Sequence, residues 1–127
     1  EYNDRTGKKP IKWDYYDDST YKKLYTTYSN LLKLRNANDD LFETSVTCNM
    51  HASLNDWNQG RWMSVYDSAK GIVVVGNFMN LETEISVTFP TTGTWYSYPD
   101  GVELTVVQPT QLITLDKESS KIYTSFK

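Results

Sequence analysis

Apolar residues recur at helical spacing near the start of the chain. They stand three, four, seven, ten and eleven positions from Tyr21. This spacing predicts one amphipathic helix over about 19–36, with the hydroxyls of Ser19 and Thr20 available to cap its start. The polar run 36–40 ends the pattern. The apolar positions are Tyr21, Leu24, Tyr25, Tyr28, Leu31 and Leu32, with Leu34 out of phase.

After about residue 44 the apolar period changes to the alternation of β-strands. The clearest run is 83–89, and runs over 102–106 and 121–126 alternate in the same way. Turn signals separate the runs, among them Asp100-Gly101, a strong hairpin signal. Seven or eight short strands at this spacing predict an antiparallel sandwich. Its expected core is Val73, Val75, Ile85, Val87, Phe89, Leu104, Ile122 and Phe126.

The predicted fold class is therefore mainly β, an antiparallel β-sandwich preceded by one amphipathic α-helix. Residues 1–18 are polar and aperiodic, and are expected to form a loop. A single amphipathic helix has one apolar stripe and no helical neighbour in this chain. Its stripe is therefore expected to lie on the sandwich or on a partner outside the chain.

Composition narrows the classes of function. A chain of 127 residues suits one compact domain, and a net charge of −3 with scattered basic residues argues against a nucleic-acid partner. The longest apolar run, 72–75, is far shorter than the roughly 18 residues of a membrane span. Aromatic residues reach 14%, which raises the question of surfaces that stack on sugars. The chain opens at Glu1 without an initiator methionine, so we expect upstream sequence.

The lone cysteine and the lone histidine do not form a metal site. Cys48 and His51 lie three positions apart on an expected strand, where alternation places them on opposite faces. No other Cys or His can complete a ligand set. We therefore expect no metal, no cofactor and no disulfide within the chain.

A series of short motifs suggests a family. They occur in the order Ile11-Lys12-Trp13-Asp14, Leu34-Arg35, Val73-Val74-Val75-Gly76-Asn77-Phe78, Gly93-Thr94-Trp95-Tyr96 and Ile122-Tyr123. In this order they resemble the C-terminal part of the alpha-amylase family of glycoside hydrolases. The resemblance implies that residues 1–44 are a loop and the last helix of a (β/α) barrel. Residues 45–127 would be the C-terminal sandwich domain that stabilises the barrel.

The same resemblance implies that the whole protein hydrolyses α-1,4-linked glucans with retention. The family's catalytic aspartate, glutamate and second aspartate belong to the barrel strands, and no residue of this chain matches their motifs. Retaining glycosidases hold two carboxyl groups about 5–5.5 Å apart on a rigid scaffold. The closest pairs here, 17–18 and 39–40, are sequence neighbours at helix boundaries, where capping or solvation is expected. We assign no catalytic residue to this chain.

Two tryptophans carry the alternative hypothesis, an autonomous carbohydrate-binding module. Trp57 and Trp62 lie in a polar, turn-rich stretch suited to a sugar platform, although large aromatic residues also cap small sandwiches. Such a module would not need residues 1–44. The expected partners are the catalytic barrel of the same polypeptide, α-glucan at these tryptophans, and a second copy through the helix stripe. Nucleic acid and a membrane span are not expected.

Overall fold

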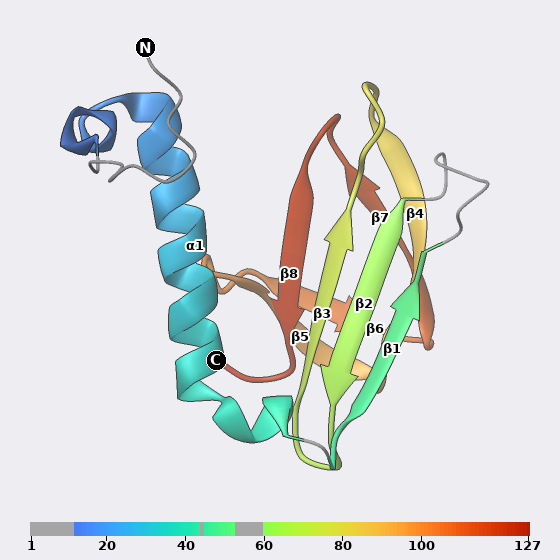
Figure 1. Cartoon of the computed structure of the whole chain (residues 1–127). Helices are drawn as coiled ribbons and strands as arrows, with labels where there is room; N and C mark the ends of the chain where they lie inside the picture. The colour runs from blue at the N-terminus through green and yellow to red at the C-terminus, as the bar shows by residue number, and fades with distance from the viewer. Residues whose placement is uncertain (1–11, 44, 53–59) are drawn as a thin grey trace. The chain divides into compact units, whose positions relative to one another are not determined.

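The computed structural model describes residues 12–43, 45–52 and 60–127 (Figure 1). Over these residues it contains one α-helix followed by eight strands, which confirms the predicted fold class. The chain divides into two compact units, Glu1–Ala37 and Asn38–Lys127. The elements are η1 (Trp13–Tyr16), α1 (Ser19–Ala37), η2 (Asp39–Phe42), β1 (Thr47–His51), β2 (Arg61–Tyr66), β3 (Gly71–Gly76), β4 (Thr83–Thr88), β5 (Gly93–Tyr98), β6 (Glu103–Val106), β7 (Thr110–Leu115) and β8 (Ser120–Thr124).

The first unit is built around α1. The cap is the carboxylate of Asp18, which accepts hydrogen bonds from the backbone N–H groups of Thr20 at 2.8 Å and Tyr21 at 3.4 Å. The expected hydroxyl caps are thus replaced by a carboxylate, which satisfies two N–H groups at the positive end of the helix dipole. Tyr15 of η1 stacks on Tyr21 with ring centroids 4.3 Å apart. The short 3-10 helix is thereby held against the first turn of α1.

The apolar stripe of α1 is exposed. Tyr28 retains 61% of its accessible surface and Leu24 retains 57%. Trp13, in the short helix before α1, is 75% exposed. Large exposed apolar areas of this kind mark interaction surfaces in soluble proteins. The exposed members of this surface, which we call the helix stripe, are Tyr21, Leu24, Tyr25, Tyr28, Leu31 and Leu32.

The second unit is a sandwich of two antiparallel sheets. The larger sheet has the order β1-β2-β3-β8-β5-β6, and β4 pairs with β7 in the smaller one. Figure 1 shows the smaller sheet behind β2 and β3 and the β5–β6 hairpin running across them. Between the sheets lies one cluster of buried residues, comprising Val73, Val75, Ile85, Val87, Phe89, Trp95, Val106, Ile113, Leu115 and Tyr123.

Alternation identified the core face correctly in most strands. Ile85, Val87 and Phe89 are buried as expected, and Trp95 fills the centre of the core. Asp100 and Gly101 lie in the connection of the antiparallel β5–β6 pair, as their hairpin signal indicated. Gly101 has a φ of 71°, a left-handed conformation that favours glycine.

The expected core face of the last strand was wrong. Ile122 and Phe126 are only half-buried, whereas Tyr123 and Thr124 are buried. β8 lies inside the larger sheet between β3 and β5, so neighbours shield its backbone on both sides. Tyr123 is the residue that turns to Phe89, with ring centroids 5.7 Å apart. Val102 is also exposed, because β6 begins one residue after it.

A lysine ties the start of the second unit to the turn between β2 and β3. The Lys70 ammonium lies 2.8 Å from the Asp40 carboxylate and donates to the side-chain oxygen of Asn38 at 3.1 Å. It also lies over the Phe126 ring, 5.8 Å from its centroid. Leu41 of η2 is fully buried, so this segment is an anchored part of the sandwich unit.

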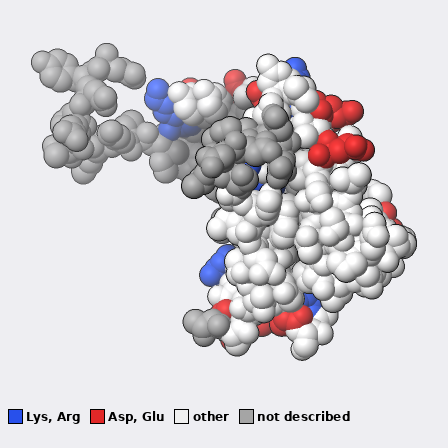
Figure 2. All heavy atoms as spheres, turned by 90° about the vertical axis from the view of Figure 1, so that its right-hand side faces the viewer, with Lys and Arg blue, Asp and Glu red and all other residues white. Residues whose placement is uncertain are grey.

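The surface agrees with the low net charge. Figure 2 shows the side on which β1 and β4 lie, with few charged side chains over its middle and acidic ones near its top and along its lower edge. Lysine and arginine form no patch on this face. In the part of the chain that the structure describes, no helix has the length and hydropathy needed to cross a membrane.

Removing the Phe89 ring should destabilise the sandwich far more than shortening a residue of the helix stripe. Phe89 is 1% exposed and packs on Trp95 and Tyr123, so Phe89→Ala should cost about 3–5 kcal/mol. Leu31 is 38% exposed, and Leu31→Ala should cost about 1 kcal/mol or less. Denaturant melts of the two variants measure this difference. Equal losses would mean that α1 is integral to the core.

Candidate functional site

Of the two tryptophans of the predicted sugar platform, the structure describes Trp62 only. Trp57 lies outside the described residues, so its pairing with Trp62 stays a prediction. Trp62, on β2, is half-buried and packs against the hydrophobic core. Its ring stacks on His51 of the neighbouring strand, with centroids 5.8 Å apart and planes 12° from parallel. One face of the indole is therefore already occupied by the imidazole.

An apolar groove of about 300 Å³ lies beside these two residues. Its walls include Met50, Met63, Val74 and Phe78, and Met50 and Phe78 are exposed. Met50, Met63 and Val74 form one cross-strand row on β1, β2 and β3. Thioether and hydrocarbon groups offer sugar hydroxyls almost no hydrogen-bonding partners, so this groove does not suit a glucan.

The neighbouring carboxylate pairs serve local structure. Asp18 caps α1, and Asp40 pairs with Lys70. Asp39 accepts a hydrogen bond from the backbone N–H of Asp40 at 3.0 Å. Among the residues that the structure describes, no three His, Cys, Asp or Glu side chains are grouped closely enough to hold a metal ion. Cys48 is exposed on β1, the strand that also carries His51.

Asn77, in the motif that follows β3, is buried and fully hydrogen-bonded. Its amide nitrogen donates to the carbonyl oxygens of Leu81 at 2.8 Å, Asp116 at 3.0 Å and Leu115 at 3.2 Å. Its side-chain oxygen accepts from the backbone N–H of Met79 at 2.9 Å. This one side chain joins the β3–β4 connection to the β7–β8 connection. The asparagine of the family-like motif is therefore a structural clamp.

Asp67 forms the turn between β2 and β3. The backbone N–H groups of Lys70 and Ala69 donate to its carboxylate at 2.8 and 2.7 Å, and these bonds lower the pKa of Asp67 below its ordinary value. The Lys70 charge acts in the same direction. A carboxylate held in this way favours the folded turn while it is ionised.

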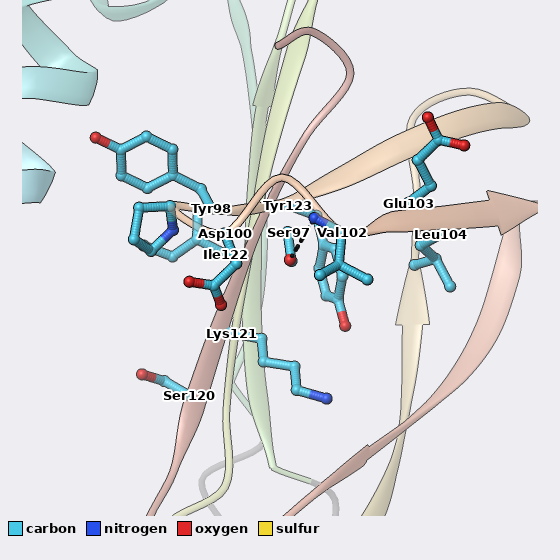
Figure 3. Close-up of a pocket in the computed structure, with 11 residues that line it drawn as sticks. Ser97, Tyr98, Asp100, Val102, Glu103, Leu104, Ser120, Lys121, Ile122 and Tyr123 are labelled. Carbon is cyan, nitrogen blue, oxygen red and sulfur yellow. Dashed lines mark hydrogen bonds between the residues drawn. The ribbon is translucent and has the colours of Figure 1, made fainter.

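A second cavity, of about 560 Å³, lies between β8 and the β5–β6 hairpin (Figure 3). Lys121 and Tyr123 project into it from β8, and Val102 and Leu104 face them from the hairpin. Asp100 lies at its rim, while Tyr98 and Glu103 point away from Lys121. This cavity combines apolar walls with a cation, a carboxylate and a phenolic hydroxyl.

The Tyr123 hydroxyl is the unusual group in this cavity. The residue is 5% exposed, and burial raises the pKa of Tyr123, so the phenol stays neutral. No hydrogen bond joins this hydroxyl to another described residue, and because no buried side-chain N or O atom among the described residues lacks a partner, the hydroxyl oxygen is accessible to solvent. Its donor and acceptor therefore face the open cavity.

Sequence reasoning did not find this cavity. Lys121 and Tyr123 occupy alternate positions of β8, with Ile122 between them, and Val102 and Leu104 belong to a separate hairpin. No local motif connects the two segments. Only the alternation of polar and apolar residues along β8 could have indicated which side chains face the cavity. That alternation led to the wrong core face for β8.

Comparison with known proteins gives no assignment: no family model matches the chain, and no curated protein matches it.

Asn77→Leu should destabilise the sandwich by about 2–4 kcal/mol, because three carbonyl groups and one N–H would lose their partner. Leucine has a similar size, so the loss would report hydrogen bonding rather than a cavity. Asn80→Leu, at an exposed position in the same connection, is the control and should change stability by about 0.5 kcal/mol at most. Denaturant melts measure both, and similar values for the two variants would refute the clamp.

The contribution of Asp67 should depend on pH. Its pKa is lower in the folded chain than the ordinary 3.8, so its stabilisation is complete above that value and is lost as the pH falls through the folded pKa. Asp67→Ala should therefore destabilise the chain at neutral pH, and its penalty should become smaller in acid, as the pH falls toward and through the folded pKa of Asp67. Melts at neutral and acidic pH test this, with Glu84→Ala as a control for losing an exposed carboxylate. A penalty that persists in acid would contradict the assignment.

Proposed function

We propose that this chain is the non-catalytic C-terminal part of an alpha-amylase-like glycoside hydrolase that acts on α-glucans. In this proposal α1 is the last helix of the catalytic barrel. The sandwich over 45–127 is the accessory domain that stabilises the barrel. The catalytic carboxylates belong to the barrel, and this chain contributes none.

The observation that carries the proposal is the exposed helix stripe. The sandwich unit buries its own core between two sheets, while six large apolar side chains of α1 are each 38% to 61% exposed. Burying a leucine or an aromatic side chain contributes roughly 1.5–3 kcal/mol. Burial of the whole helix stripe against a partner would therefore be strongly favourable. Trp13, in η1 before the helix, is exposed as well.

The order of motifs supports a barrel as that partner. Trp13 and Asp14 precede the helix, Leu34-Arg35 lies in its last turn, and Asn77 and Trp95 follow in the order of the motifs that carry the resemblance. Two of these residues have clear structural roles in the sandwich. Asn77 joins two connections, and Trp95 fills the core while its indole N–H donates to the Thr91 carbonyl at 3.0 Å.

The alternative, an autonomous carbohydrate-binding module, requires an open aromatic platform. Trp62 is half-buried against the core, and the His51 ring lies parallel to it with the centroids 5.8 Å apart. The apolar groove beside it provides few polar groups. These observations favour the accessory-domain proposal over a module built on Trp62.

The 127-residue chain should release no reducing sugar from starch, maltodextrins or nitrophenyl maltosides. The polypeptide encoded by the complete reading frame should release it, because it would include the barrel and its carboxylate pair. Both are assayed side by side against a buffer blank. Activity of the short chain that disappears on mutation of one of its residues would refute the proposal, as would a complete reading frame without a barrel.

In the longer polypeptide, the double substitution Leu24→Ser and Leu32→Ser tests whether the helix stripe packs against the barrel. It should lower the thermal stability of the enzyme, since both side chains would lose buried contacts. The same substitutions in the 127-residue chain should leave the unfolding of the sandwich nearly unchanged. Equal effects in the two contexts would contradict a role of the helix stripe in holding a barrel.

A further inference from the structure

The strand β1 forms one edge of the larger sheet. The sheet has the order β1-β2-β3-β8-β5-β6, so among the described residues β1 pairs with β2 alone (Figure 1). Residues 47–50 are all exposed, and Met50 retains 73% of its accessible surface. An edge strand of this kind presents backbone N–H and C=O groups that can pair with a further strand.

Proteins usually protect such an edge with charged side chains, with proline or by making the strand very short. β1 has the sequence Thr-Cys-Asn-Met-His and contains no lysine, arginine, acidic residue or proline. At the opposite edge, the four-residue strand β6 carries Glu103, which lies 3.4 Å from the Lys127 ammonium. In the smaller sheet β4 carries Glu84, and the Lys121 ammonium donates to the Thr114 carbonyl of β7 at 3.4 Å. In the part of the chain that the structure describes, β1 is therefore the least protected edge.

The outer face of the sheet is apolar where it reaches this edge. Val73 and Val75 belong to the core, so Val74 between them lies on the outer face. Val74 pairs in register with Met63 of β2, and Met63 pairs with Met50 of β1. The three side chains form one row in the wall of the apolar groove of about 300 Å³. A strand that pairs with β1 would therefore lie next to Met50, at the end of this row.

A second apolar row runs beside the first on the same face. Cys48 of β1 pairs in register with Val65, and Val65 pairs with Ile72. Val65 and Ile72 are buried, whereas Cys48 is exposed at the edge. The other three residues of β1 are polar, and alternation places them on the opposite face.

These features make β1 complementary to a second copy of itself. Antiparallel pairing about a two-fold axis at Asn49 is the register that pairs all 5 residues of both strands. It sets Cys48 of each copy opposite Met50 of the other, so each apolar row continues into the other row. On the opposite face it sets Asn49 against Asn49, and Thr47 against His51. Because β1 carries no lysine, arginine or carboxylate, no like charges of these groups meet across the pair.

We propose that β1 is a self-association surface, through which two copies of this chain pair edge to edge in this register and join their larger sheets into one. A single short strand from each copy makes a smaller interface than a stable protein complex usually has, so the dimer should be weak and reversible. The pairing does not use the helix stripe. It therefore does not depend on the proposed function.

Sedimentation equilibrium of the 127-residue chain over a range of concentrations tests this surface, and should show a reversible equilibrium between monomer and dimer. Met50→Lys and Cys48→Glu each put a charge on the edge at an exposed position, so both variants should fold. Each should weaken the dimer about tenfold, because two symmetric cross-strand contacts are lost. An equimolar mixture of the two variants should recover the association, because the register sets the new lysine opposite the new glutamate.

Two controls separate β1 from the other exposed apolar surfaces. Leu112→Lys puts the same charge on β7, at a side chain that is 66% exposed, and should leave the dimer unchanged. The double substitution Leu24→Ser and Leu32→Ser makes the helix stripe more polar, and should also leave the dimer unchanged.

Three results would overturn the proposal. The first is a chain that stays monomeric at every concentration. The second is a dimer that survives Met50→Lys but is lost with the polar helix stripe. The third is a failure of the two charged variants to associate when mixed, which would mean another register or another surface. None of these results bears on whether the complete reading frame encodes an active barrel, so the proposed function is judged separately.

Discussion

The packing of three aromatic rings holds the sandwich together. Phe89 follows β4 of the smaller sheet and contacts Trp95 of β5 and Tyr123 of β8 in the larger one, at centroid distances of 5.1 and 5.7 Å. Both contacts have the edge-to-face geometry that aromatic pairs prefer. Because β4 and β7 form a separate two-stranded sheet, contacts of this kind are what keep it on the larger sheet. The position of Tyr123, and with it the cavity beside β8, depends on this cluster.

The two units of the chain differ in how far they bury their apolar side chains. The sandwich encloses a continuous core and satisfies its buried polar side chains, including Asn77, within itself. The helix unit is capped by Asp18 and stacked at its start by Tyr15 and Tyr21, yet it leaves its apolar stripe accessible. A helix with good local structure and no burial of its stripe gains most of its stability from a partner. This contrast is the physical basis of the proposed docking to a barrel.

The motifs that suggested a family have structural rather than chemical roles in this chain. Asn77 uses both of its amide hydrogens and its oxygen to join two connections, and Trp95 satisfies its indole N–H while its ring fills the core. Such residues are restricted by geometry, since few other side chains combine their shape with their hydrogen bonds. Tyr123 belongs to the Ile122-Tyr123 motif and likewise has a packing role, because its ring contacts Phe89.

The sequence by itself determined the order and type of the elements. Helical spacing from Tyr21 and alternation over 83–89 are local patterns, set by the geometry of the backbone, and both were read correctly. The tertiary structure decided which face of β8 enters the core, because Ile122 and Tyr123 are both apolar enough for either side. It also decided that Asn77 reaches three carbonyl groups and that Lys121 and Val102 line one cavity. Each of these outcomes depends on contacts between segments that are distant in the chain, or on a choice between two neighbouring residues that could both fill the same position. The periodicity of one segment contains neither kind of information.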